Sequence, residues 1–305
     1  VDLGLGWRLT GEREYARQGI ALLRALSRLD LRDSISGPGA GMVVARGYVP
    51  IATGYDLLAD HPEWSEADEA AFRAWSRRLV EMIVESRALW RRNHYFNRQY
   101  YQNHEVAMTL GLLTAGIVLR DRELAQFALD HPENHRDLID LISGAILMPG
   151  DETHHREPEG WELHPGEIYD RYRHHTAKAP VPHEGGKGLQ YAHLSLSLLT
   201  MAAELLHNNG IDLYAYSAPG GESLERAHAF YCDFYARRDS SLKGGLYAGE
   251  TGRLGKVGDS PALFEIAARR YPDNPHLAEC VRLIRDQDCE RERLIGHLAL
   301  LWGVD

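Results

Sequence analysis

Apolar residues recur along most of this chain at the three- to four-residue spacing of an amphipathic helix, and few segments alternate as a strand does. Near the start, Leu5, Leu9, Ile20, Leu23 and Leu26 follow this spacing. Gly, Pro and polar breaks between such segments predict a series of helices joined by short turns. The helices are expected at residues 3–29 (two helices), 43–58, 65–90, 106–119, 121–130, 134–147, 189–208, 222–238, 260–270, 276–287 and 290–302.

Capping residues mark several of these boundaries. Trp7–Glu12 is predicted to be a turn between the first two helices, with Thr10 as N-cap. Ser65 and Asp68 are spaced as a capping box. The Asn-Asn-Gly run at 208–210 is expected to end the helix that starts near residue 189. Short turns between consecutive helices favour antiparallel pairing, so the pattern by itself predicts an all-α array of helical hairpins.

The helical spacing is lost between residues 150 and 188, where Gly, Pro, His and charged residues dominate. A long irregular segment inside a compact domain is usually functional. We therefore expect a single catalytic domain over residues 1–305, with a long active-site loop insert at 150–188. Because Val1 follows no initiator Met and no basic-then-apolar leader, we expect the chain to be processed or truncated at this end.

Composition limits the class of partner. The chain has 305 residues, of which 44% are hydrophobic, which is ample for a core. A net charge of −10 argues against a nucleic-acid partner, because phosphate binding requires a basic surface. No apolar run reaches the roughly 18–20 residues that span a bilayer, so we expect no membrane partner. An anionic small substrate stays compatible with this charge, because a cationic cleft can form inside an acidic protein.

Six residues from Tyr100 to Glu105 form the first chemical cluster, immediately before an apolar helix. Aromatic, amide, imidazole and carboxylate groups make a poor core but suit a binding surface at a helix N-terminus, where unpaired N–H groups favour an anion. Asn103 supplies amide donors, and His104 can donate or accept a proton near neutral pH. The alternative interpretation is that the Asn caps the helix and the His packs in the core.

A second polar cluster spans residues 151–175, and seven of the sixteen histidines lie between 154 and 193. Arg and His with Trp and Tyr are suited to an acidic sugar, because charged donors hold carboxylates and aromatic faces stack on sugar rings. A zinc site is the alternative. We expect no metal, because the adjacent pairs at 154–155 and 174–175 cannot both ligate from one face and no HExxH or CxxC occurs.

The three cysteines, Cys232, Cys280 and Cys289, match no metal or redox spacing and are expected to be buried thiols.

A third cluster, 187–193, opens a later helix and includes Tyr191. A tyrosine in such a position is, taken alone, more often a core or rim residue than a catalytic one.

With these clusters the chain resembles the alginate-lyase superfamily of polyuronate lyases. One carrying segment is the Asn-His pair that opens an apolar helix, Asn103 to Met108. The other is Tyr191 after a basic residue at a helix start, followed by the Asn-Asn-Gly-Ile-Asp-Leu-Tyr run at 208–214. The resemblance implies an (α/α) toroid, an incomplete barrel of helical hairpins around a cleft. It also implies β-elimination of a uronic-acid polymer, alginate or glucuronan, without a cofactor, in the periplasm or outside the cell.

The resemblance further implies roles for individual residues. Asn103 and His104 would neutralise the C6 carboxylate of the sugar, and Tyr191 would act as acid, base or both. A tyrosine of reference pKa about 10 needs cationic neighbours to act as base, and His104 or His193 is the alternative base. The predicted substrate-binding residues are Tyr101, Gln102, His155, Arg156, Trp161, Arg171, Arg173, Lys187 and His193.

One departure concerns the Arg that the family usually has shortly before the Tyr. Residues 184–190 contain Lys187 as their only cation, and a Lys cannot reproduce the bidentate hydrogen bonds of an Arg to a carboxylate.

Two other functions stay open. One is an (α/α)-barrel glycoside hydrolase that uses two carboxylates among Asp151, Glu152, Glu167 and Asp170. The other is a non-catalytic helical sugar-binding protein.

Overall fold

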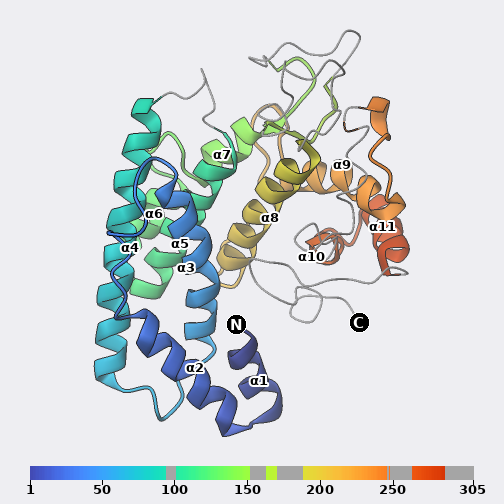
Figure 1. Ribbon diagram of the computed structural model, residues 1–305. Coiled ribbons are helices and arrows are strands. Elements are labelled where there is room, and N and C mark those ends of the chain that lie inside the picture. The colour runs from blue at the N-terminus through green and yellow to red at the C-terminus, as the bar shows by residue number, and fades with distance from the viewer. Residues whose placement is uncertain (94–100, 152–162, 170–187, 246, 248–262, 286–305) are drawn as a thin grey trace. The chain divides into compact units, whose positions relative to one another are not determined.

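The computed structural model describes residues 1–93, 101–151, 163–169, 188–245, 247 and 263–285 (Figure 1). Within these ranges helices are the main secondary structure, which confirms the predicted all-α class. The helices are α1 (Asp2–Thr10), α2 (Arg13–Leu26), α3 (Ala40–Asp56), α4 (Glu66–Asn93), α5 (Asn103–Leu119), α6 (Arg122–Leu129), α7 (Leu138–Ala145), α8 (Gly188–His207), α9 (Leu224–Arg237), α10 (Leu263–Arg270) and α11 (Pro275–Arg285). The helix predicted at 290–302 lies outside the described residues.

Two of the predicted helix boundaries are confirmed by their capping bonds. Asp68 N donates to Ser65 Oγ over 3.2 Å, and the Asp68 carboxylate accepts from Ser65 N over 2.9 Å, which is a complete capping box. At the end of α8, Ile211 N donates to Leu206 O and Gly210 N donates to His207 O. Together they form a Schellman motif, and Gly210 adopts the left-handed φ of 81° that this motif requires.

Two other boundary predictions are wrong. Thr10 is the last residue of α1 rather than an N-cap, because its hydroxyl donates back to Gly6 O and Gly11 ends the helix. The helix predicted at 134–147 is shorter at both ends. Asp137 accepts a hydrogen bond from His131 N in a turn before α7, and residues 146–147 leave the helix to form a strand.

The strand that follows α7 belongs to a two-stranded antiparallel ribbon. Strand β1 (Ile146–Leu147) pairs with β2 (Glu167–Ile168), with Ile146 opposite Ile168. Strand β2 lies inside the segment that was predicted to be an irregular insert. No local pattern of two residues could reveal this pairing, because it depends on the partner strand.

The described chain forms two compact units. The first contains residues 1–93 and 107–137, and the second contains residues 101–106 and the described residues from 138 to 285. Helix α5 therefore begins in the second unit and continues in the first. None of the described helices combines the length and the apolar character that crossing a membrane requires.

Aromatic packing between α3 and α4 dominates the first unit, where the two helices run side by side (Figure 1). The ring of Tyr55 stacks on Phe72 with centroids 4.3 Å apart, and Trp75 is fully buried beside Tyr48. Arg73 of α4 donates to the carbonyls of Val118 and Leu119, which are free acceptors at the end of α5.

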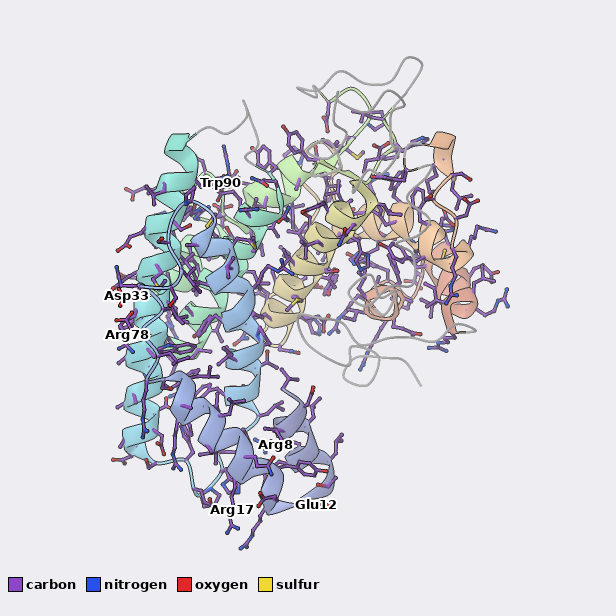
Figure 2. All side chains as sticks on the ribbon, in the orientation of Figure 1. Arg8, Glu12, Arg17, Asp33, Arg78 and Trp90 are labelled. Carbon is purple, nitrogen blue, oxygen red and sulfur yellow. The ribbon has the colours of Figure 1, made fainter. Side chains whose placement is uncertain are left out.

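Charged pairs cover the outside of this unit. Arg8 and Arg17, labelled in Figure 2, pair with Asp60 and Glu63 over 2.6 and 3.1 Å. Both pairs are exposed, so each contributes little to stability. Arg24 makes a bidentate bond to Asp68, and this bond together with the Ser65 cap lowers the pKa of Asp68 well below its usual range.

Helix α9 packs against α8, α10 and α11 in the second unit. Arg270 of α10 makes a bidentate bond to the buried Glu204 of α8, which also accepts from Tyr214 Oη.

On α9, His228 is fully buried. Its Nδ1 lies 2.7 Å from Leu224 O and its Nε2 lies 2.9 Å from Thr200 Oγ1. Because a carbonyl only accepts, Nδ1–H donates to Leu224 O in the neutral ring, and Nε2 faces the Thr200 hydroxyl, which also lies 2.8 Å from Leu196 O as a donor.

Burial lowers the pKa of His228 from 6.5 to about 4. Between these two pH values His228 is therefore protonated in the unfolded chain and neutral in the folded chain. We expect acidification from pH 6.5 to 4 to remove about 3 kcal/mol of stability through this group. The substitution His228→Gln keeps hydrogen-bonding capacity and should remove this part of the pH dependence. Urea unfolding at several pH values measures it.

The matched control for this prediction is His135→Gln, the same replacement at an exposed histidine. The control should keep the acid sensitivity of the wild-type protein. If the stability of the His228 variant and that of the control depended equally on pH, the buried ring would not be the cause of the acid sensitivity.

Candidate functional site

Four consecutive polar residues at the start of α5 have buried side chains. Gln102, Asn103, His104 and Glu105 are each at most 9% exposed. The main chain of Gln102 closes the first turn, since its carbonyl accepts from Glu105 N and Val106 N. Burial of so many amide, imidazole and carboxylate groups is unfavourable unless each is hydrogen-bonded. The cluster predicted from the sequence is therefore a buried polar turn at a helix N-terminus rather than an exposed face.

The rest of α5 explains why this turn is held in place. From Val106 to Leu119 the helix is apolar on all sides, and residues such as Met108, Leu112 and Ala115 are fully buried. A helix that is apolar all round has no solvent face and is surrounded by protein. The polar turn is thus the end of a buried helix, where its N–H groups and side chains have fixed directions.

Tyr101 connects this turn to the β-ribbon. Its ring contacts Tyr169 edge to face, with centroids 6.3 Å apart, in a cluster with Leu147 and Leu163. The ring also lies directly over Gly144 of α7, so closely that a Cβ atom there would overlap it. Tyr169 belongs to the second polar cluster of the sequence. The structure therefore brings an end of that cluster against the residue that precedes the polar turn.

The ribbon is itself anchored to α9. Tyr231 Oη accepts from Ile168 N over 2.9 Å and shares a hydrogen bond with Tyr247 Oη over 2.8 Å. All three residues are fully buried. These contacts hold β2, and with it Tyr169, at a defined place in the second unit. Sequence reasoning missed this ribbon, since neither strand is long enough to give an alternating pattern.

Two of the four carboxylates considered for the hydrolase alternative make hydrogen bonds that stabilise turns. Asp151 Oδ2 accepts from Met148 N over 2.7 Å, and Glu167 Oε1 accepts from His164 N over 2.7 Å. Each bond closes a turn next to the ribbon, and Glu167 is fully buried. A general acid or base must reach the glycosidic oxygen or its attacking water, which these two braced groups do not favour. Glu152 and Asp170 lie outside the described residues.

Tyr191 and His193 occupy different sides of α8. Tyr191, on the first turn, is half-buried, whereas His193 is buried with its ring 4.6 Å from Tyr235 and 6.3 Å from Phe264. Two residues correspond to about 200° around a helix, so the two side chains point in nearly opposite directions. The packing of His193 is that of a core histidine. Its predicted contact with substrate stays a prediction.

The predicted residues thus fall into two groups. Asn103-His104 opens α5 and Tyr191 lies on the first turn of α8, and both helix starts belong to the second unit. Tyr101 and Gln102 directly precede the start of α5. Outside the described residues lie Tyr100 of the first polar cluster and the predicted contacts His155, Arg156, Trp161, Arg171, Arg173 and Lys187.

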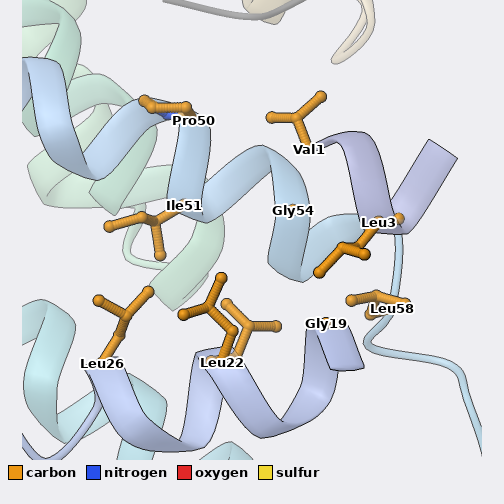
Figure 3. Close-up of a pocket in the computed structure, with 11 residues that line it drawn as sticks. Val1, Leu3, Gly19, Leu22, Leu26, Pro50, Ile51, Gly54 and Leu58 are labelled. Atoms are coloured by element: carbon orange, nitrogen blue, oxygen red, sulfur yellow. The ribbon is translucent and has the colours of Figure 1, made fainter. Parts of the chain in front are cut away.

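A pocket in the first unit offers different chemistry (Figure 3). It lies among α1, α2 and α3 and has a volume of about 150 Å³. Every side chain that lines it is apolar, including Leu22, Leu26, Ile51 and Leu58, and the remaining lining residues are glycines. A sugar acid needs charged or polar donors, so this pocket is not a candidate for the predicted substrate.

Comparison with known proteins identifies the family of this chain. The sequence model of the alginate lyase family matches residues 1–145 and 171–241. Alginate lyase A1-III from Sphingomonas species A1 has a TM-score of 0.68 and 18% identity, over 99% of this chain and 74% of that one. An alginate lyase from Bacteroides ovatus has a TM-score of 0.65 and 14% identity, over 99% and 72%. These matches confirm the predicted (α/α)-toroid fold class.

A further similar structure is a tyrosine-to-phenylalanine variant of alginate lyase A1-III complexed with tetrasaccharide. Its TM-score is 0.66 and its identity 17%, over 99% of this chain and 75% of that one. No curated protein sequence matches this chain at a significant level.

The contact between Tyr101 and Gly144 gives a test of this region. In Gly144→Ala the new methyl group overlaps the tyrosine ring, so the ring must move, at a cost of about 1–3 kcal/mol. We expect lower stability in urea unfolding and, because Tyr101 precedes the polar turn, weaker binding or turnover of substrate. Gly47→Ala is the control, since it lies in a helix with open space around its Cα. Equal behaviour of the two variants would contradict the assigned role of Tyr101.

Proposed function

The chain belongs to the alginate lyase family of polysaccharide lyases, and we propose that it cleaves a uronic-acid polymer, alginate or glucuronan, by β-elimination. The observation that carries this proposal is the buried polar turn at Asn103-His104, at the N-terminus of an apolar helix. Amide and imidazole donors fixed in a water-poor site can stabilise a developing negative charge far better than mobile groups in water.

The reaction makes a specific demand on these donors. The proton on C5 of a uronate lies next to the C6 carboxylate and is very weakly acidic. When it leaves, negative charge spreads onto that carboxylate. Asn103 and His104 donate hydrogen bonds to the carboxylate oxygens and so stabilise this charge. The positive end of the α5 dipole acts in the same direction.

Tyr191 completes the elimination in this proposal. A base removes the C5 proton, the electron pair of that C–H bond forms the C4–C5 double bond, and the C4–O4 bond breaks. The leaving O4 receives a proton. The half-buried Tyr191 at the start of α8 donates that proton and, with cationic neighbours, also takes the C5 proton. Lys187, Arg171 and Arg173 are the proposed cations, and Arg156, His155, Trp161, Gln102 and Tyr101 the further substrate contacts.

The similar structures support the residue types chosen here. Two of them are variants of alginate lyase A1-III complexed with tetrasaccharide, one with a tyrosine replaced by phenylalanine and one with a histidine replaced by alanine. We infer that an anionic polysaccharide is the substrate of this chain.

The proposal predicts the product and the effect of two substitutions. Incubation with alginate, polyglucuronate or polymannuronate should produce an unsaturated sugar that is followed by its ultraviolet absorbance. Tyr191→Phe and His104→Ala should each lower kcat by about a hundredfold or more, which is the usual contribution of a general acid–base group and of a donor to a developing negative charge, respectively. Tyr15→Phe, at a partly exposed tyrosine of the first unit, is the control and should leave kcat unchanged.

Three outcomes would overturn the proposal. Unchanged activity in both the Tyr191 and the His104 variants would remove their assigned roles. Cleavage that yields reducing ends without a double bond would indicate a hydrolase, and tight binding without any turnover would indicate a sugar-binding protein.

A further inference from the structure

Helices α9 and α11 pack against each other and bring two cysteines into contact. Cys232 and Cys280 are both buried and carry free thiols, and their Sγ atoms lie 2.9 Å apart. They are separated by 48 residues in sequence. Their spacing therefore gave no motif, and only the packing of the two helices brings them together.

Two further ligand types adjoin the thiols. Asp233 follows Cys232 on α9, and its Oδ1 lies 3.6 Å from Cys280 Sγ. His276 precedes Cys280 by one helical turn on α11, and its Nε2 lies 3.9 Å from Cys280 Sγ and 3.4 Å from Asp233 Oδ2. One potential ligand atom from each of the four residues lies within 4.8 Å of the other three.

We propose that Cys232, Asp233, His276 and Cys280 form a structural zinc site that fastens α11 to α9. Two sulfurs, an imidazole nitrogen and a carboxylate oxygen are a donor set typical of tetrahedral zinc. With four protein ligands, the site leaves no open position for a substrate, so its role is to stabilise the fold rather than to catalyse.

The distances agree with this coordination. Zinc bonds of about 2.3 Å to sulfur and about 2.0–2.1 Å to nitrogen and oxygen give tetrahedral edges of about 3.7, 3.5 and 3.3 Å for S–S, S–N or S–O, and N–O pairs. The observed S–O separation of 3.6 Å, from Cys280 Sγ to Asp233 Oδ1, matches, and the S–N separation of 3.9 Å is slightly long. The 3.4 Å from His276 Nε2 is to Asp233 Oδ2, the oxygen that Lys243 contacts, so the imidazole must turn towards Oδ1 when the metal binds. The sulfurs must move apart from 2.9 Å. Binding must also replace the contact of His276 Nε2 with Ala229 O, 3.2 Å away.

Charge balance gives a second, independent argument. Two thiolates and a carboxylate carry three negative charges, and zinc neutralises two of them. The remaining negative charge faces two cations: the ammonium group of Lys243 lies 2.7 Å from Asp233 Oδ2, and the exposed Arg237 lies 4.0 Å from Asp233 Oδ1. Asp233 can thus bind the metal through one oxygen while Lys243 orients it through the other, as outer hydrogen bonds commonly do around metal sites.

Access to the site is consistent with metal loading in the folded protein. The side chain of His276 is 46% exposed, whereas that of Asp233 is 12% exposed and both cysteines are buried. The imidazole therefore lies at the surface edge of the cluster. The other chemistry available to two adjoining thiols is a disulfide, which would remove both thiolates from metal binding.

The experiment uses the full chain, purified with a phosphine reductant that keeps its thiols reduced. Zinc is added, excess metal is removed by dialysis, and bound zinc is measured by elemental analysis. Cobalt, used as a second probe, should give the thiolate charge-transfer absorbance and the intense visible bands of a tetrahedral site. We expect one equivalent of zinc per chain, and a rise in Tm when zinc is restored after chelation.

Four variants separate the site from non-specific binding. Loss of an outer hydrogen bond already weakens metal sites by about 10–100-fold, so His276→Ala and Cys232→Ser should each weaken zinc binding by more than about a hundredfold. The matched controls His135→Ala and Cys289→Ser should retain one equivalent. Because His276 is at the surface, its variant should fold even if the buried cysteine variant does not.

Three results would overturn the proposal. One is less than a tenth of an equivalent of zinc on the reduced wild-type chain. Another is equal zinc binding by His276→Ala and His135→Ala. The third is a Cys232–Cys280 disulfide, found by peptide mass spectrometry, in protein that binds no zinc after reduction.

Discussion

Burial of polar groups at the start of α5 is the constraint on which the candidate site depends. A buried amide, imidazole or carboxylate is tolerated only when its surroundings hold hydrogen-bonding partners in fixed positions. Gln102 to Glu105 form such a turn, and the apolar body of α5 fixes its direction. Fixed donors need no reorganisation when charge develops on a bound carboxylate, and this property suits the elimination that we propose.

The surroundings of this turn are correspondingly rigid. Tyr101 is confined between Gly144 of α7 and Tyr169 beside the ribbon. The ribbon turns are closed by the carboxylates of Asp151 and Glu167. Of the four acidic residues considered for a hydrolase, these two, which lie in the described part of the chain, therefore brace the scaffold.

Helix α9 serves as the common support of the second unit. His228 bonds to Thr200 of α8, Tyr231 holds strand β2, and Cys232 meets Cys280 of α11. These three contacts come from neighbouring turns of one helix, so a displacement of α9 would disturb all three partners. The proposed zinc site would fix its connection to α11 and, through α9, stabilise the ribbon that carries Tyr169.

The sequence by itself determined what depends on neighbouring residues. The helical class, the capping box at Ser65, the end of α8 at Gly210 and the polar start of α5 are all local patterns, and two of them led to the correct family. Tertiary structure decided the rest: the ribbon of β1 and β2, the contact of Tyr101 with Tyr169, and the meeting of Cys232 with Cys280. Each joins residues far apart in the chain, and such contacts follow from the packing of whole elements, which no local periodicity encodes.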